Sequence, residues 1–337
     1  MKKSVNVGNV IIGDSRFIPV QTMTNTDTRD VSATLAQIDR LSRAGADLVR
    51  VTVQDDEAAL AFKEIVQGTD VPLIADIHFD ARVAIKAIEA GAKKIRLNPG
   101  NTPLNVVRDI VKCATDYRVP IRVGVNRGSV KGEVTAEKMV DLCLATADKL
   151  EKLGFYDLVL AVKSSDVREA IDAYRLLSTK TDHPLHLGLT EAGVGETARL
   201  QSAMALGALL VDGIGDTVRV SIAGDPAQEV YVARKILNYL GLRHDMPKVV
   251  ACPTCGRTVI DVEGLATRVE KSVENIHKNI KIAVMGCIVN GLGEGRDADV
   301  GIAGGKDYSI LFNNGERVKT VKNEDIEKEL LKYVGEL

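Results

Sequence analysis

Three cysteines and one glutamate in the last third of the chain have the residue types and spacing of a metal site. Cys252 and Cys255 lie in the segment C-P-T-C-G-R, and Cys287 lies in G-C-I-V-N-G-L-G-E. Three thiolates are one ligand fewer than a closed tetrahedral site needs, so the fourth position is open or is held by a group other than sulfur. An open metal position indicates chemistry on a bound substrate.

Glu294 is the candidate fourth ligand, because it follows Cys287 at seven residues across a glycine-containing segment that we expect to be a loop. Glycines let the backbone approach an inorganic cluster and direct its amides at sulfide. A solvated surface carboxylate is the other interpretation of Glu294. A structural zinc site is the other interpretation of the cysteines, although neither His244 nor His277 has the spacing that would complete it.

The composition limits the class of protein. The chain has 337 residues, of which 45% are hydrophobic, enough for one large and one small domain. Its formal charge of −2 offers no general attraction to nucleic acid. No run approaches the roughly 20 apolar residues that span a bilayer, and no secretory signal is present, so we expect a cytoplasmic protein. In a reducing compartment five cysteines favour thiolate ligation over disulfides, and Cys113 and Cys143 are expected to be core residues.

Short β-rich runs alternate with helix-length amphipathic stretches through residues 1–242. Strands are expected at Val20–Met23, Leu48–Val53, Leu73–His78, Ile95–Asn98, Ile121–Val125, Leu158–Lys163, His186–Thr190 and Gly213–Arg219. Helices are expected at Val31–Arg43, Ala58–Val66, Ala81–Ala90, Leu104–Ala114, Ala136–Leu153, Val167–Leu177, Glu196–Leu206 and Ala227–Leu240. Eight such units predict an α/β fold of the (β/α)8 TIM-barrel type. A doubly wound open sheet is the alternative, but V-Q-T-M-T-N-T lacks the glycine fingerprint of that fold.

Cations from five different strands are expected to face one mouth of the barrel, because alternate residues of a strand share a face. They are Arg50, Arg96, Arg122, Lys163 and Arg219. Any one of them alone would be read as a solvated or ion-paired residue. Five together require an anionic partner, since an unpaired buried charge is costly. Guanidinium groups match phosphate oxygens, so the expected ligand is a small molecule with more than one phosphate.

Other polar residues are expected at the same strand ends. They are Asp76, His78, Asn98, Asn126, Thr190, Glu191 and Ser221. Asp76 and Glu191 are too few to neutralise five cations. Glu191 is a candidate proton donor, or else it holds an arginine in place. His78 either donates to the phosphates or is a core histidine.

A second, smaller domain is expected at residues 247–337, after the linker Gly241–Pro247. Its strands are expected at Lys248–Ala251, Ile280–Met285, Asp299–Ala303, Tyr308–Phe312 and Arg317–Val321, and its helices at Gly264–Lys278 and Glu324–Val334. The pair Asn314-Gly315 favours a tight hairpin turn between the last two strands. The pattern is that of a small α+β unit.

The linker also predicts the assembly. The last barrel helix runs antiparallel to the strands and should end at the face opposite the mouth. Seven linker residues extend at most about 25 Å, which leaves little reach around the barrel. We therefore expect the cysteine domain of one subunit to cover the barrel of another, in a homodimer with composite active sites.

Segments along nearly the whole chain resemble one known family. They are P-V-Q-T-M-T-N-T, A-D-I-H-F, I-R-L-N-P-G-N, I-R-V-G-V-N, H-L-G-L-T-E-A-G, D-G-I-G-D-T-V-R-V-S, A-C-P-T-C-G-R and G-C-I-V-N-G-L-G-E. Together they are similar to the bacterial 4-hydroxy-3-methylbut-2-enyl diphosphate synthases of the non-mevalonate isoprenoid route. The family has N-G-P-G-E where this chain has Leu292 in place of proline, a departure that concerns the stiffness of the segment before Glu294 more than its chemistry.

The resemblance implies an oxidoreductase that reduces 2-C-methyl-D-erythritol 2,4-cyclodiphosphate with two electrons and loss of water. It implies a [4Fe-4S] cluster on Cys252, Cys255, Cys287 and Glu294, in a domain resembling sulfite reductase modules. It places the five cations and Ser221 around the diphosphate, with the other polar residues lining the site. Because the chain has no nucleotide fingerprint, electrons are expected singly from flavodoxin or ferredoxin.

The sequence is also compatible with two other classes of protein. One is a barrel transferase of the pterin-synthase type with a structural zinc ion. The other is a non-enzymatic iron–sulfur carrier or sensor, which gives no reason for five cations at the mouth.

Overall fold

The computed structural model describes residues 3–337 except 14–16, 78–80, 98–103, 131 and 275. The chain forms two compact units, which divide between Arg243 and His244. In the described part of the chain, no helix is both long and apolar enough to cross a bilayer.

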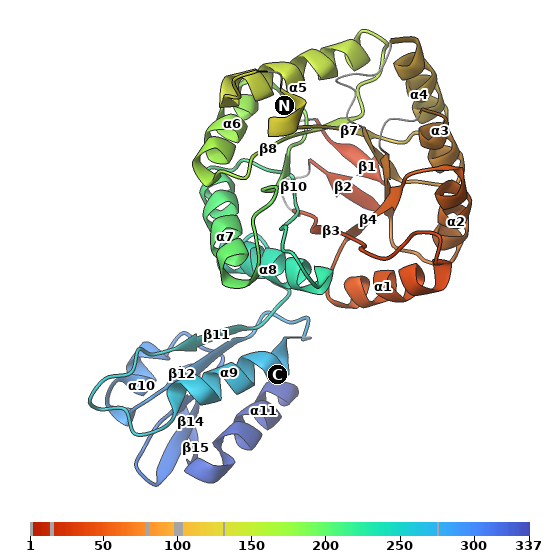
Figure 1. Cartoon of the computed structure of the whole chain (residues 1–337). Helices are drawn as coiled ribbons and strands as arrows, with labels where there is room; N and C mark the ends of the chain where they lie inside the picture. The colour runs from red at the N-terminus through yellow and green to blue at the C-terminus, as the bar shows by residue number, and fades with distance from the viewer. Residues whose placement is uncertain (1–2, 14–16, 78–80, 98–103, 131, 275) are drawn as a thin grey trace. The chain divides into compact units, whose positions relative to one another are not determined.

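The first unit is a closed barrel of eight parallel strands (Figure 1). The strands are β3 (Gln21–Met23), β4 (Leu48–Val53), β5 (Leu73–Ile77), β6 (Lys94–Leu97), β7 (Ile121–Asn126), β8 (Leu158–Lys163), β9 (His186–Leu187) and β10 (Thr217–Val218). Strands β3 to β8 pair in sequence order, and β9 pairs with β10. Parallel bridges from Leu160 to Leu185 and from Val20 to Val218 close the ring. The predicted barrel is confirmed.

Helices α1 to α8 surround these strands as an outer ring (Figure 1). They are α1 (Val31–Arg43), α2 (Asp56–Gln67), α3 (Ala81–Glu89), α4 (Leu104–Tyr117), α5 (Ala136–Glu151), α6 (Val167–Lys180), α7 (Gly195–Val211) and α8 (Pro226–Tyr239). Several begin at side-chain caps: Asp55 accepts a hydrogen bond from the Ala58 N–H, and Asp166 from the Glu169 N–H. Such caps satisfy amides that have no partner inside the helix and contribute about 1 kcal/mol each.

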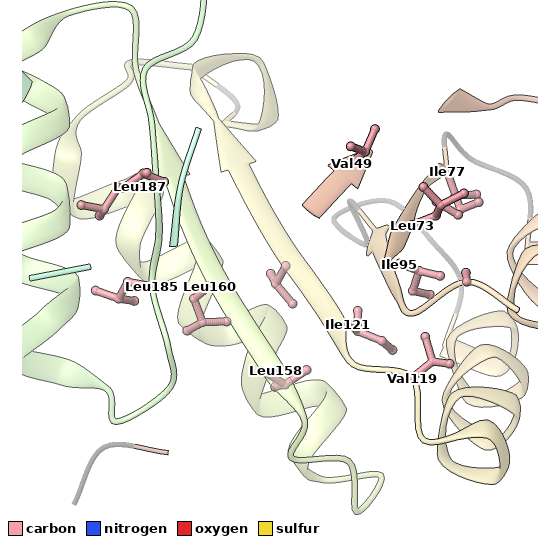
Figure 2. Packing of buried hydrophobic residues seen from close by; sticks show 14 of the residues in the cluster. Val49, Leu73, Ile77, Ile95, Val119, Ile121, Leu158, Leu160, Leu185 and Leu187 are labelled. Atoms are coloured by element: carbon pink, nitrogen blue, oxygen red, sulfur yellow. The ribbon is translucent and has the colours of Figure 1, made fainter. Parts of the chain in front are cut away.

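The two faces of the barrel strands differ in polarity. Outward-facing residues such as Leu73, Ile95 and Leu160 are fully or almost fully buried and form the apolar layer between strands and helices (Figure 2). Burial of each such side chain contributes roughly 2 kcal/mol, and the layer is continuous around the barrel. Because side chains alternate along a strand, the residues between them, among them Arg50 and Arg122, point into the barrel.

An antiparallel hairpin precedes the first barrel strand and was not predicted from the sequence. It consists of β1 (Val5–Val7) and β2 (Val10–Ile12), with Gly8 at a φ of +62° in the turn. Its apolar side chains pack in one cluster with Leu48, Ile74 and Val159, which lie near the amino ends of their strands. The hairpin therefore supplies apolar cover at that end of the barrel, and the polar interior lies toward the carboxyl ends.

Two barrel strands are shorter than the sequence predicted. The expected strands His186–Thr190 and Gly213–Arg219 are reduced to the two-residue strands β9 and β10. The glycines Gly213 and Gly215 adopt φ values of +71° and +118°, which form the turn after α7. A residue with positive φ cannot be part of an extended strand. An apolar run beginning at Gly213 was therefore not enough to predict where the strand starts.

The second unit is a five-stranded sheet with three helices. Its strands are β11 (Lys248–Ala251), β12 (Lys281–Met285), β13 (Val300–Ala303), β14 (Tyr308–Asn313) and β15 (Glu316–Lys322), in that order across the sheet. Its helices are α9 (Val262–Val273), α10 (Ile288–Glu294) and α11 (Ile326–Glu336). The first three strands are parallel, and the β14–β15 hairpin turns at Asn314-Gly315, which has positive φ at both residues as predicted.

The segment between Cys287 and Glu294 is helix α10, so the prediction of a loop there was wrong. Its glycines serve close packing: a Cβ on Gly291 would lie 2.6 Å from the Ala303 Cβ. That contact lets the short helix lie against strand β13, which compensates for the low helix propensity of glycine.

Candidate functional site

A cavity of about 230 Å³ lies at the carboxyl ends of the barrel strands. Eight of the predicted substrate-binding residues line it: Arg50, Asp76, Arg96, Arg122, Asn126, Lys163, Thr190 and Arg219. Ser221 contacts one of them, Arg219. His78 and Asn98 lie outside the described residues. The structure thus gathers side chains from the five barrel strands β4 to β8 and from the segments after β9 and β10 around one space.

Asp76 lies between two of the cations. Its carboxylate oxygens are 3.7 Å from the Arg50 Nε and 3.5 Å from the Arg96 Nη1. The Arg50 Nη2 is also 2.9 Å from the sulfur of Met23. Burial lowers the pKa of Arg50 to about 10, opposed by the charge of Asp76. One carboxylate is thus shared by two guanidinium groups.

Arg122 is the most deeply buried cation that lines the cavity. It is only 4% exposed, and its Nε and Nη1 have no hydrogen-bond partner among the described residues. Burial, and then the charges of Arg50 and Arg96, lower its pKa well below the ordinary value. Burial likewise lowers the pKa of Lys163, with Arg122 adding to the effect. Donors without partners in a closed space are arranged for a ligand that brings acceptor oxygens.

Arg219 has a carboxylate partner that sequence reasoning missed. Glu229 of α8 accepts from the Arg219 Nη2 at 2.9 Å and from its Nε at 3.2 Å. The Arg219 Nη1 donates to the Ser221 Oγ at 2.8 Å. Glu229 also accepts from the Thr22 hydroxyl at 3.0 Å. The sequence contained a signal for this partner. Glu229 lies on the same helix face as the buried Ala233, and a carboxylate on a buried face needs a cationic partner.

Glycine at position 188 is required by the same wall of the cavity. A Cβ there would lie 2.5 Å from the Arg219 carbonyl oxygen and 3.1 Å from the Lys163 Nζ. The first distance is shorter than any stable contact, and the second would displace the amine. The glycine in H-L-G-L-T-E-A-G therefore allows β9 and the segment after β10 to approach closely and leaves room for Lys163.

Thr190 and Glu191 follow β9 at the mouth. The Thr190 N–H donates to the Ser164 carbonyl at 3.1 Å, which fixes the segment. Glu191 is exposed, does not line the cavity, and has a φ of +54°. That conformation costs a non-glycine residue on the order of 1 kcal/mol, and such strain is concentrated at functional sites. Its role as a proton donor remains a prediction.

The three predicted cysteine ligands come from two adjoining loops of the second unit. Cys252 directly follows β11 and Cys287 follows β12, two parallel neighbours in the sheet. The Cys252 N–H donates to the Val284 carbonyl at 3.2 Å, and the Gly286 N–H donates to the Cys252 sulfur at 3.1 Å. The Val259 N–H donates to the Gly286 carbonyl at 3.0 Å. This bond holds the loop that contains Cys255 against the segment that precedes Cys287.

The donor set fits a cluster with thiolate ligands. A hydrogen bond from the Arg257 backbone N–H, and then the charge of Arg257, lower the pKa of the Cys255 thiol. A Cβ on Gly286 would meet Thr258 and Val262 at 2.9 Å, so this amide can lie beside sulfur only as glycine. Cys287 is the N-cap of α10 and Glu294 its last residue. Seven residues at about 100° each complete nearly two turns, so these two share a helix face.

In the described part of the chain, no three His, Cys, Asp or Glu side chains converge closely enough to hold a metal ion, and this includes the four predicted ligands Cys252, Cys255, Cys287 and Glu294. The ligands of a four-iron cluster lie farther apart than those of one ion, because each binds a different iron. Three thiols and an exposed carboxylate are donor types that an iron–sulfur cluster accepts.

Two family models match the chain. The GcpE TIM-barrel domain matches residues 2–234, and the GcpE protein C-terminal domain matches residues 248–336. Among curated proteins, the chain is 50% identical to the "4-hydroxy-3-methylbut-2-en-1-yl diphosphate synthase (flavodoxin)" of Thermotoga petrophila, over 100% of this chain and 98% of that protein. It is 49% identical to the protein of the same name from Caldanaerobacter subterraneus, over 100% of this chain and 97% of that protein.

Solved structures of dihydropteroate synthases resemble the barrel. The Yersinia pestis enzyme aligns with a TM-score of 0.53 at 15% identity, covering 72% of this chain and all of that one. The Xanthomonas albilineans enzyme aligns with a TM-score of 0.52 at 14% identity, covering 72% of this chain and 98% of that one. At this identity the likeness concerns the fold alone, and it supplies no support for the transferase reading.

Proposed function

The chain belongs to the GcpE family, and from this premise we propose that it reduces 2-C-methyl-D-erythritol 2,4-cyclodiphosphate to 4-hydroxy-3-methylbut-2-enyl diphosphate. As a member of that family it is an oxidoreductase. The relatives named above are flavodoxin-dependent by name, which supports flavodoxin as the electron donor. The reaction takes up two electrons, opens the ring at a carbon–oxygen bond and releases water.

The charge of the barrel cavity is the observation that supports this substrate most directly. Five cations line the space, and two carboxylates of the described residues contact them: Asp76, shared by two arginines, and Glu229 on Arg219. A small ring with two phosphates would supply the missing negative charge. Guanidinium forks on Arg50, Arg96 and Arg122 would bind the phosphate oxygens and orient the ring, with the Lys163 amine as a further donor.

Cys252, Cys255, Cys287 and Glu294 would hold a [4Fe-4S] cluster. When bound, that group supplies one-electron transfer at a low potential and Lewis acidity at the iron that has no cysteine. Glu294 is exposed at the end of α10, which supports a carboxylate ligand that the substrate can displace. The Glu191 carboxyl group would give its proton to the departing oxygen.

The test of this function is anaerobic purification followed by electron paramagnetic resonance of the reduced protein, with and without the cyclic diphosphate. We expect iron and sulfide in equal amounts, a cluster signal that changes when the ligand is added, and formation of the linear diphosphate. A colourless protein that contains zinc, or a cluster signal that the ligand leaves unchanged, would contradict the proposal. The second outcome would favour a carrier or sensor.

Changing Glu294 to alanine should leave the cluster bound but labile and lower turnover by roughly 10- to 100-fold, the range seen when metal sites lose a supporting group. Iron content before and after dilution, together with turnover, measures both effects. Asp297→Ala is the matched control, since Asp297 is an exposed carboxylate three residues farther along. Turnover that is equal in Glu294→Ala and in the control would exclude Glu294 as a ligand.

We also propose a cytoplasmic homodimer in which the cluster unit of one subunit completes the barrel site of the other. The short linker supports this arrangement, and so does the outer surface of α7 and α8. There Leu200, Met204, Val211 and Tyr239 are all more than half exposed, beside an apolar hollow of about 440 Å³. Contiguous exposed apolar surface of this kind marks protein interfaces. All five cysteines are free, consistent with a reducing compartment.

The double change Leu200→Glu and Met204→Glu should therefore weaken the dimer at least about 30-fold, because it places two charges in the buried centre of the interface. Turnover should fall in parallel, since each site needs both subunits. Sedimentation velocity measures the assembly. Leu60→Glu, at a leucine of α2 that is 70% exposed, is the control and should remain dimeric. A fully active monomer would contradict the composite site.

A further inference from the structure

Two titratable side chains lie inside the barrel beneath the cations of the cavity. Lys94 precedes Arg96 by two residues on β6, and His186 begins β9. Residues two apart share a strand face and are separated by about 6.6 Å along the strand. Both side chains are therefore directed inward but lie nearer the amino ends of their strands. Both are 0% exposed, and neither lines the cavity.

Among the described residues, neither side chain has a partner that would stabilise a charge. The Lys94 Nζ donates to the Gln21 Oε1 at 3.4 Å, a long bond to a neutral amide. The two ring nitrogens of His186 have no hydrogen-bond partner among the described residues. The Tyr174 hydroxyl donates to the backbone carbonyl of His186, not to its ring. In a closed interior this arrangement fits a neutral amine and a neutral imidazole.

The charged groups of the described residues that act most on this pair are cations. Arg122 of β7 and Arg50 of β4 act on Lys94, while Gln21 of β3 is neutral. Lys163 of β8, Arg122, Lys94 and Arg50 act on His186. Burial is the main cause that lowers the pKa of each group well below its ordinary value, and these cations lower it further. The ligand-free barrel therefore opposes protonation at both positions.

We propose that Lys94 and His186 accept protons from solvent when the cyclic diphosphate binds above them. This inference rests on the proposed function of the cavity and adds a proton-linked step to ligand capture. An amine and an imidazole each gain one proton and one positive charge, and no bond of the ligand changes. The protons come from the surrounding buffer.

The ligand reverses the electrostatic balance that keeps the pair neutral. A phosphate charge about 8 Å from an amine favours its protonation by roughly 30-fold at an effective dielectric constant of about 20. A ligand with two phosphates carries at least two such charges. It also neutralises Arg122 and Arg50, the cations that act on both groups. The protonated Lys94 would then hold the phosphates as a sixth cation behind Arg122.

The test is isothermal titration of the cyclic diphosphate into the oxidised, cluster-loaded full chain without reductant, in buffers of different ionisation enthalpy. At pH 8 we expect a net uptake of about one proton or more per site. Affinity should then fall by about tenfold for each unit of pH increase between 7.5 and 9, because proton uptake couples binding to acidity. Lys94→Met and His186→Asn should each reduce the uptake and flatten this dependence.

Lys180→Met is the control, since Lys180 lies at the surface and pairs with Asp141. It should leave proton uptake unchanged. Binding without net proton uptake by the natural chain, or with the same uptake in Lys94→Met and His186→Asn, overturns this inference and leaves the proposed function intact. The absence of any binding removes both. The measurement on the natural chain decides the matter even where a variant does not fold.

Discussion

Replacing Arg122 with methionine is expected to lower the affinity for the cyclic diphosphate by about 100-fold, the loss of a charge-assisted, doubly donating contact in a closed site. The same change should raise the melting temperature of the ligand-free protein. Arg122 is buried beside Arg50 and Arg96, and its Nε and Nη1 have no partner among the described residues. Removing a buried charge without a full set of partners relieves a cost of folding.

A lower affinity together with a higher melting temperature would show that Arg122 serves ligand binding and not folding. Calorimetry with the cyclic diphosphate measures the first quantity and thermal unfolding the second. Arg168→Met is the control, because Arg168 of α6 is at the surface, where it pairs with Asp172 one turn away. It should alter neither quantity appreciably. A destabilised Arg122→Met protein with undiminished affinity would assign Arg122 a structural role instead.

Replacing Cys287 with serine is expected to reduce turnover by more than about 100-fold, since even groups behind metal ligands account for 10- to 100-fold. Bound iron and sulfide should fall with it, because a serine hydroxyl is a poor substitute for a thiolate. The helix should survive: Cys287 is the N-cap of α10 without a side-chain capping bond, and serine is among the preferred residues there. Loss of the cluster would then not result from misfolding.

Iron and sulfide analysis with far-ultraviolet circular dichroism separates these effects. Cys113→Ser is the matched control, since Cys113 lies in α4 of the barrel unit and has no predicted ligand role. Its variant should retain the cluster. Full iron content and turnover in Cys287→Ser would remove this residue from the ligand set.

Much of the barrel was predictable because its signals are local. Side chains alternate between the two faces of a strand, so parity alone directed Arg50, Asp76 and Lys163 to the inner face. The residues between them pack against the helices (Figure 2). Asn314-Gly315 likewise predicts its hairpin turn, because the two residues accept positive φ without help from the rest of the fold.

Local signals failed where tertiary packing competes with them. The G-rich segment before Glu294 has low helix propensity, yet α10 forms because Gly291 lies directly against Ala303. The run from Gly213 is apolar enough for a longer strand, but positive φ at Gly213 and Gly215 delays the start of β10 to Thr217. A propensity of about 1 kcal/mol per residue is smaller than the energy of a packed contact, so the contact prevails.

The sequence by itself determined the kinds of chemistry available: three thiols with one carboxylate, and cations at the ends of parallel strands. Only the tertiary structure decided how those charges are balanced. Glu229 reaches Thr22 across 207 residues of chain, and Lys94 reaches Gln21 across 73. Pairing energies depend on distances in space and on burial, which no local pattern specifies. For that reason the partner of Arg219 and the buried pair Lys94 and His186 became visible only in the folded barrel.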